Sequence, residues 1–229
     1  MNNSINNSIN NFNFTKENLL ISKELTHSLL DRFDTIFNEG IYKNDTSNMQ
    51  ELTKDTISKE PLFTSILSQI HKKFQSITNV TDLKFEKLWL VNSKSNDTSK
   101  AILPYVPHID KKRFLKAMIY LNDVSIDHGP IHLGKAKNNI DIEQKRKKLP
   151  SDYKARNLNV ISNENLETNL IPMLGEAGDV IFFDTNTPHK AGIISEGYYR
   201  KILRFDFERP FFNSNKNILK SFFNKIIKI

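Results

Sequence analysis

Residues 178–189 read GDVIFFDTNTPH. The Gly-Asp pair at the start is a turn signal, and the four apolar residues 180–183 after it are typical of a short, fully buried strand. The polar residues that follow end at His189, which therefore comes just after a buried strand. We expect a strand over residues 179–183 and regard His189 as a candidate functional residue.

Further short strands are expected on both sides of this stretch, with turn signals between them. Their expected ranges are 84–91, 105–110, 114–121, 129–133 and 199–207. Before them, apolar residues recur at helical spacing over 21–37, with Ser22 as N-cap and Gly40 as the C-terminal stop. A second helix begins at Pro61. Helices followed by a series of short strands indicate an α+β protein with an antiparallel sandwich or barrel.

The chain is expected to form one domain over 15–229, after an Asn-rich, disordered leader at 1–14. Within the domain we expect a helical part at 15–80 and a β core at 81–210. A polar insertion at 136–171 is typical of a lid or binding loop. Residues 214–229 are predicted to form a basic amphipathic helix, which packs on the barrel or, alternatively, lies on a membrane surface.

Composition excludes several classes of protein. With no Cys among 229 residues, disulfide scaffolds, thiolate metal sites and cysteine nucleophiles are ruled out. No apolar run is long enough for a transmembrane segment, and the N-terminus lacks the features of a secretory signal, so a cytoplasmic protein is expected. The net charge is +7, but the basic residues are scattered among 26 acidic ones, so no nucleic-acid partner is expected.

His108 and Asp110 form the motif that carries chemistry. Residues two apart on a strand face the same side, so the imidazole and the carboxylate are expected to project together. With His189 as a third ligand, two imidazoles and one carboxylate leave open positions on a metal, which suits non-heme Fe(II).

Arg200 lies eleven residues after His189, on a strand whose alternation places it on one face with Arg204. A buried guanidinium needs an anion, and a dicarboxylate cosubstrate would supply one. The alternative for Arg200 is a surface salt bridge. Arg204 either pairs with Asp206 or Glu208 or binds an acidic group of the substrate.

These motifs resemble those of the Fe(II)- and 2-oxoglutarate-dependent dioxygenases, and among them the phytanoyl-CoA dioxygenase-like group, from about Leu88 to Pro210. The resemblance implies a double-stranded β-helix (a jelly-roll or cupin-like barrel) flanked by N-terminal helices and a C-terminal helix. It implies that His108, Asp110 and His189 are the catalytic iron ligands and that Arg200 holds the distal carboxylate of 2-oxoglutarate; Tyr120 is placed in the same cosubstrate site. The chain departs from the group at residues 133–137 (LGKAK) and at Ala191, where the group often has Pro-Gly-Ser-His and Ser.

The implied reaction is hydroxylation of a C–H bond of a small or carrier-bound metabolite by dioxygen, with release of succinate and carbon dioxide. Because Asp110 retains the metal-binding carboxylate, hydroxylation is favoured over halogenation. Trp89, Tyr105 and Arg204 are expected to contact the substrate. Two alternatives stay open: a cupin-like metal enzyme that does not use 2-oxoglutarate, and a non-catalytic basic binding module.

Overall fold

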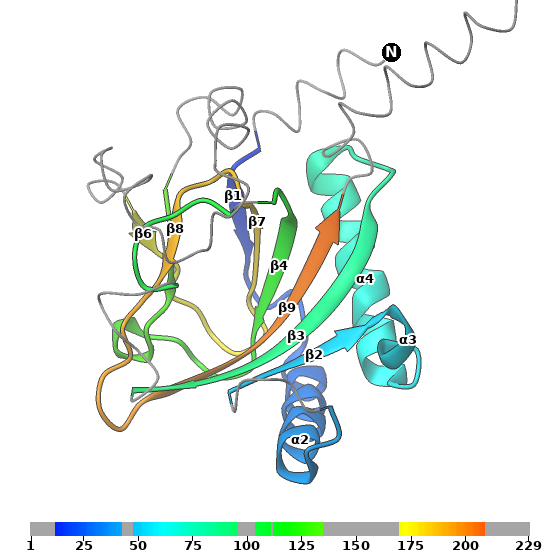
Figure 1. Ribbon diagram of the computed structural model, residues 1–229, viewed down its shortest axis with the longest axis horizontal. Helices are drawn as coiled ribbons and strands as arrows, with labels where there is room; N and C mark the ends of the chain where they lie inside the picture. The colour runs from blue at the N-terminus through cyan, green and yellow to red at the C-terminus, as the bar shows by residue number, and fades with distance from the viewer. Residues whose placement is uncertain (1–11, 43–47, 96–103, 111, 135–169, 209–229) are drawn as a thin grey trace, which may run out of the picture.

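The computed structural model describes residues 12–42, 48–95, 104–110, 112–134 and 170–208. Two antiparallel sheets form the β core, one with the strand order β1-β7-β4-β9-β3-β2 and the other with the order β6-β5-β8 (Figure 1). The helices lie beside the larger sheet, on the side away from the smaller one (Figure 1). This is the expected α+β architecture with a jelly-roll barrel and helices in front of it.

The strands have the following bounds: β1 Phe14–Glu17, β2 Met49–Thr53, β3 Lys84–Lys94, β4 Leu115–Tyr120, β5 Ile131–Leu133, β6 Ile171–Pro172, β7 Val180–Asp184, β8 His189–Ala191 and β9 Tyr199–Glu208. The strands expected from the sequence at 84–91, 114–121, 129–133, 179–183 and 199–207 are confirmed, with ends that shift by one to three residues. The largest shift is in β3, which was expected to end at residue 91 and continues through Lys94.

The two predicted helices are confirmed with their caps. Helix α2 spans Lys23–Glu39, Ser22 accepts a hydrogen bond from the Leu25 amide, and Gly40 ends the helix in the left-handed conformation at φ 61°. Helix α4 spans Pro61–Thr78 and begins with its proline. A short helix α3, Lys54–Ile57, precedes it. Gly178 explains how α2 meets the sheet: its φ is 98°, and a Cβ there would lie 2.4 Å from the Ile21 carbonyl oxygen.

Alternation along the strands divides the interior into two apolar clusters. On β9, Leu203, Phe205 and Phe207 point to one side and pack with the helices, and all three are fully buried. Ile202 points to the other side, into a second cluster inside the barrel that also contains Tyr120. The same strands therefore bury one face against helices and present the other face to the barrel interior.

The structure corrects the expected boundaries at the N-terminus. The leader was predicted to extend to residue 14, but Phe14 begins β1, which pairs with β7, and the Phe12 ring contacts Phe74 edge-on at 6.0 Å. The region expected to be helical, 15–80, also contains β2 at the edge of the larger sheet. These short strands lack the apolar alternation by which strands are recognised.

The segment 105–110 is not a regular strand, contrary to expectation. Within it only His108 forms a bridge, in which its amide and carbonyl exchange hydrogen bonds with those of His189, both at 2.9 Å. Pro104 and Pro107 have no N–H to donate, so a continuous ladder cannot form through them. The Pro104 carbonyl still accepts from the Ala191 amide at 2.8 Å, which keeps the segment beside β8.

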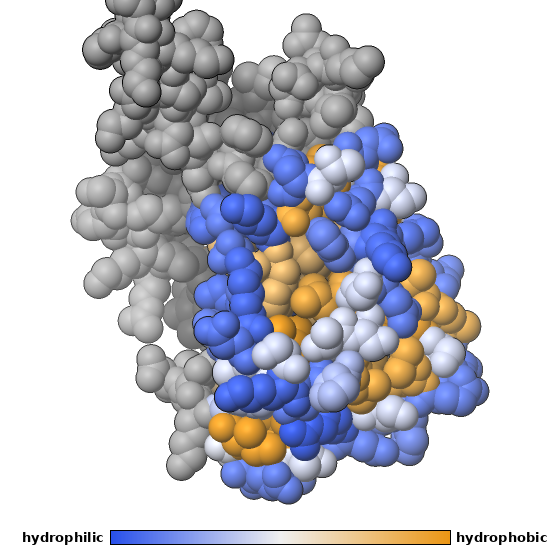
Figure 2. Space-filling model, turned by 90° about the vertical axis from the view of Figure 1, so that its right-hand side faces the viewer, coloured by the Kyte–Doolittle hydropathy of each residue, from blue (hydrophilic) through white to orange (hydrophobic). Residues whose placement is uncertain are grey.

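Three predicted segments lie outside the described residues: the leader up to residue 11, the C-terminal helix at 214–229, and all but the last two residues of the insertion at 136–171. None of the helices in the described ranges has the length and apolar character that crossing a bilayer requires. Figure 2 shows the side of the molecule on which α3 and α4 lie, where hydrophilic residues predominate and apolar ones form separate patches.

Candidate metal centre

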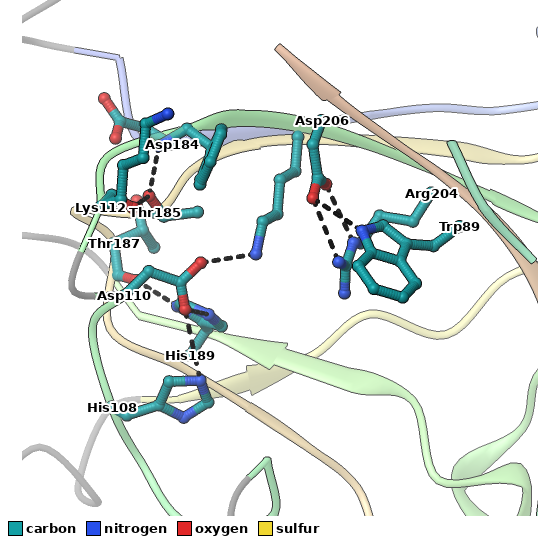
Figure 3. A network of polar contacts seen from close by, with 12 residues as sticks. Trp89, His108, Asp110, Lys112, Asp184, Thr185, Thr187, His189, Arg204 and Asp206 are labelled. Atoms are coloured by element: carbon teal, nitrogen blue, oxygen red, sulfur yellow. Dashed lines mark hydrogen bonds and ion pairs between the residues drawn. The ribbon is translucent and has the colours of Figure 1, made fainter. Parts of the chain in front are cut away.

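His108, Asp110 and His189 meet at one point inside the barrel, as the sequence predicted. Oδ1 of Asp110 lies 3.7 Å from Nε2 of His108 and 3.5 Å from Nε2 of His189. All three potential ligand atoms lie within 4.8 Å of one another, and the two imidazole rings are 4.3 Å apart (Figure 3). Two imidazole nitrogens and a carboxylate oxygen at this separation can converge on one metal ion.

Backbone carbonyls fix the orientation of both imidazoles. Nδ1 of His108 lies 2.8 Å from the Val106 carbonyl oxygen, and Nδ1 of His189 lies 2.8 Å from the Thr187 carbonyl oxygen. A carbonyl oxygen can only accept, so each Nδ1 carries the proton and donates it. In a neutral ring of this tautomer Nε2 keeps its lone pair, which is the arrangement that metal-ligating histidines usually show.

The ionisation states also suit a cation. Burial, together with the neighbouring His189, lowers the pKa of His108 to about 3, so this imidazole is neutral at pH 7. Burial alone would raise the pKa of Asp110, but Lys116, His189 and His108 outweigh it and hold that pKa well below its ordinary value. The cluster thus contains a neutral imidazole, that of His108, and the negative charge of Asp110.

The triad faces a cavity of about 360 Å³, within the usual size of small-molecule sites. Arg200 lines the same cavity and is only 5% exposed. Its Nε and Nη1 atoms have no hydrogen-bond partner in the described part of the chain. Burial lowers the pKa of Arg200, although Tyr120 and Tyr105 oppose that shift. The surface salt bridge considered from the sequence is not what the structure shows: the guanidinium is buried and needs an anion.

The remaining predicted residues differ in their relation to the cavity. Tyr105 and Arg204 line it, whereas Trp89 and Tyr120 do not. The Tyr120 hydroxyl donates to the Met173 carbonyl at 2.7 Å inside the second apolar cluster. A direct contact between Tyr120 and a cosubstrate therefore finds no support in this geometry, because the hydroxyl is turned to a backbone partner.

Arg204 is held by Asp206, one of the two partners that the sequence allowed. Nε and Nη2 of Arg204 donate to the two carboxylate oxygens at 2.9 and 3.1 Å, and Nε1 of Trp89 donates to the same carboxylate at 3.2 Å (Figure 3). The Arg204 guanidinium also stacks over the Trp89 ring at 5.3 Å. Trp89 thus contacts Asp206 and Arg204 but does not line the cavity itself.

Lys116 is a site residue that the sequence analysis missed. It is 8% exposed, lines the cavity from β4, and its Nζ donates to Oδ2 of Asp110 at 2.5 Å. A signal was present: Lys116 is a single charged residue in an apolar strand, two positions before Met118 on the same face.

Comparison with known proteins gives matches for both the family and the fold. The model of the phytanoyl-CoA dioxygenase family (PhyH) matches residues 31–202, well over half of the chain. A search of curated proteins finds no match.

Solved structures share the fold at low sequence identity. The alpha-ketoglutarate-dependent epimerase SnoN from nogalamycin biosynthesis is 14% identical, with a TM-score of 0.62 over 91% of this chain and 83% of SnoN. The carbocyclase SnoK of the same biosynthesis, also alpha-ketoglutarate dependent, is 13% identical, with a TM-score of 0.62 over 90% of this chain and 83% of SnoK. A prolyl-4-hydroxylase from Pseudomonas putida is 14% identical, with a TM-score of 0.55 over 91% of this chain and 99% of that one.

A jelly-roll barrel with two imidazoles and one carboxylate in its cavity is typical of the non-heme Fe(II) oxygenases. The chain belongs to the phytanoyl-CoA dioxygenase family, which confirms the resemblance seen in the sequence. By class it is an Fe(II)- and 2-oxoglutarate-dependent oxygenase. This sets aside the two alternatives left open by the sequence: a cupin-like enzyme without 2-oxoglutarate and a non-catalytic binding module.

Proposed function

We propose that the protein hydroxylates a C–H bond of a small or carrier-bound metabolite, with Fe(II) bound by His108, Asp110 and His189 and the distal carboxylate of 2-oxoglutarate bound by Arg200. The observation that carries the proposal is that one cavity contains both a three-donor cluster and a buried guanidinium, two nitrogens of which have no partner among the described residues. The guanidinium has no evident use in folding, since it leaves two buried nitrogens without a partner among the described residues.

Each residue has a defined task in this proposal. Iron and 2-oxoglutarate together supply the oxidising chemistry, in which dioxygen is consumed and succinate and carbon dioxide are released. The two imidazoles offer their Nε2 lone pairs because their Nδ1 protons are donated to carbonyls. Arg200 offers paired donors to a carboxylate, which fixes the cosubstrate in one orientation.

Hydroxylation is the outcome that we favour among those of the fold. SnoN is described as an epimerase and SnoK as a carbocyclase, so the fold by itself does not choose the reaction. Asp110 provides the carboxylate that halogenating relatives typically lack, and its Oδ1 faces both histidines. Tyr105 and Arg204 are the predicted substrate contacts that line the cavity.

The test compares metal binding and cosubstrate binding in matched variants. Metal-free protein is titrated with Co(II), and the metal-loaded protein is then titrated with 2-oxoglutarate under argon. We expect His189→Ala to weaken Co(II) binding by more than about 100-fold, because it removes a ligand and not only a supporting contact. His27→Ala is the control, since His27 is an exposed residue of α2, and it should leave binding unchanged.

Arg200→Met distinguishes binding of the cosubstrate from binding of the metal. It should leave Co(II) affinity as it is and weaken 2-oxoglutarate binding by about 10- to 100-fold, the worth of a charge-assisted hydrogen bond. In air, with Fe(II) and no added substrate, the wild type should form succinate slowly and His189→Ala should not. A wild-type protein that binds Co(II) no better than His189→Ala would refute the proposal.

A further inference from the structure

Lys116 places its ammonium group on the outer oxygen of Asp110. Nζ is 2.5 Å from Oδ2, whereas the other oxygen, Oδ1, faces the two histidine Nε2 atoms at 3.7 and 3.5 Å. The carboxylate is therefore divided between two tasks: one oxygen is directed at the cluster and the other is occupied by a cation.

This division matters for the number of positions left on a metal. Two imidazoles and one carboxylate oxygen fill three positions of a six-coordinate ion and leave three open. A 2-oxo acid is a bidentate chelator and needs two of these. If Asp110 bound through both oxygens, it would fill one of the open positions. The chelator would then have to take the two that remain, whether or not they are the pair aligned with Arg200, and none would be left for dioxygen.

A second carboxylate, that of Asp206, lies within reach of Lys116. Lys116 on β4 is the direct cross-strand partner of Asp206 on β9, and side chains of such pairs leave the sheet about 5 Å apart. Both residues are buried, at 8% and 2% exposure. Two adjacent groups of opposite charge on one sheet face would normally pair with each other.

The Asp206 carboxylate does not pair with Lys116 because it already accepts hydrogen bonds from other donors. Arg204 donates to both of its oxygens, at 2.9 and 3.1 Å, and Trp89 donates to Oδ2 at 3.2 Å. Figure 3 shows this cluster of Trp89, Arg204 and Asp206 on the opposite side of the site from Asp110 and the histidines. Lys116 is thereby left to Asp110.

We propose that Lys116 is a positioning residue that restricts Asp110 to binding the metal through Oδ1 alone, and that Arg204 and Trp89 keep Lys116 there by occupying Asp206. This inference rests on the proposed function, because it takes Asp110 as a metal ligand. It gives Arg204 a role that differs from the predicted contact with an acidic substrate group.

The first test uses Lys116→Met with Co(II) and without 2-oxoglutarate. The visible spectrum of bound Co(II) should change, because a second Asp110 oxygen enters the coordination sphere. Co(II) affinity should stay equal or rise, since one bond is added and a nearby positive charge is removed. The affinity of the Co(II) protein for 2-oxoglutarate should fall by about tenfold.

The second test uses the competing carboxylate. Arg204→Met frees Asp206, which then draws Lys116 away from Asp110, so this variant should reproduce the spectrum and the weakened 2-oxoglutarate binding of Lys116→Met. The double variant Arg204→Met/Asp206→Asn removes the competitor and should restore both properties. If Arg204 acted only by touching a ligand, the double variant would behave like Arg204→Met.

The outcomes separate the inference from the function on which it rests. Loss of Co(II) binding in Lys116→Met would show a merely structural lysine and overturn the inference, while His189→Ala still reports on the metal site. An unchanged Co(II) spectrum with weakened 2-oxoglutarate binding would mean that Lys116 contacts the cosubstrate directly, and would overturn it as well. Failure of the wild type to bind Co(II) would refute the proposed function itself.

Discussion

The two faces of the larger sheet are made by the same strands but are used differently. On the outer face of β9, Phe205 and Phe207 are fully buried against the helices, and the aromatic ring of Phe207 lies 5.7 Å from that of Phe74. On the inner face of the same strand, Arg200 and Arg204 line the cavity. A strand of alternating residues thus supplies folding energy on one side and charged groups on the other.

Buried charged groups also differ between the helical layer and the cavity. In the helical layer, Glu60 is paired twice with Arg32, at 2.8 and 2.6 Å, and accepts a third hydrogen bond from Tyr42 at 3.0 Å. In the cavity, two nitrogens of Arg200 lack a partner among the described residues. The charge of the helical layer is satisfied within the fold, whereas the charge for which we propose a ligand has no partner among the described residues, at a cost in stability.

Phe205→Ala, on the face that packs against the helices, should have the largest effect on stability. Truncation of a fully buried Phe removes apolar contacts and leaves a cavity, so the free energy of unfolding should fall by about 3–5 kcal/mol. The Co(II) affinity of the folded fraction should not change, because Phe205 faces the helices. Denaturant unfolding and Co(II) titration measure the two quantities; a loss of metal affinity with intact fold would show that the faces are not independent.

Glu60→Gln tests the paired charge of the helical layer. Arg32 is the main cause that lowers the pKa of Glu60, with burial opposing it and Tyr42 assisting. The carboxylate therefore adds stability that is complete above the ordinary pKa of glutamate and is lost as the pH falls through its lower folded-state pKa. At pH 7 the variant should lose about 2 kcal/mol, and its loss should shrink under acid. Unfolding curves at a series of pH values measure this; a loss that is independent of pH would contradict it.

Arg200→Met should have the smallest effect on stability, and with the opposite sign. Two nitrogens of this buried charge have no partner in the described ranges, so replacing it with an apolar side chain should stabilise the ligand-free protein by about 1 kcal/mol, or raise its melting temperature by about 2–4 °C. Addition of Co(II) and 2-oxoglutarate should then stabilise the wild type more than the variant. Thermal unfolding with and without ligands checks both statements, and a destabilised ligand-free variant would argue that Arg200 supports the fold.

Much of this organisation could be predicted from the sequence because it depends on alternation. The faces of β9 follow from residue parity, and His189 could be selected as a candidate because it comes shortly after the buried strand β7. The association of Lys116 with Asp110 could not be predicted in this way, because it depends on what Asp206 binds, and Asp206 lies on another strand. The strand expected at 105–110 did not form because periodicity does not register the missing amide proton of Pro107.

The edges of the sheets were the least predictable part. β2 reads MQELT and β8 has only three residues, so neither shows the pattern of a strand on its own. Their pairing is decided by neighbours distant in the sequence: β2 pairs with the long strand β3, and β8 pairs with β5, which has only three residues itself. Tertiary context of this kind is invisible to a reading of local periodicity.

The position of β1 has a practical consequence for making the protein. Its residues cover the free edge of β7, and the carbonyl oxygen of Asn13 accepts from the Asp184 amide at 2.9 Å and from Oγ1 of Thr187 at 3.1 Å, two residues before His189. A recombinant chain that started after residue 17 would expose a row of unpaired amides and carbonyls, which invites edge-to-edge association between molecules. An affinity tag or protease cleavage site therefore belongs upstream of Phe12, where it leaves the pairing of β1 with β7 intact.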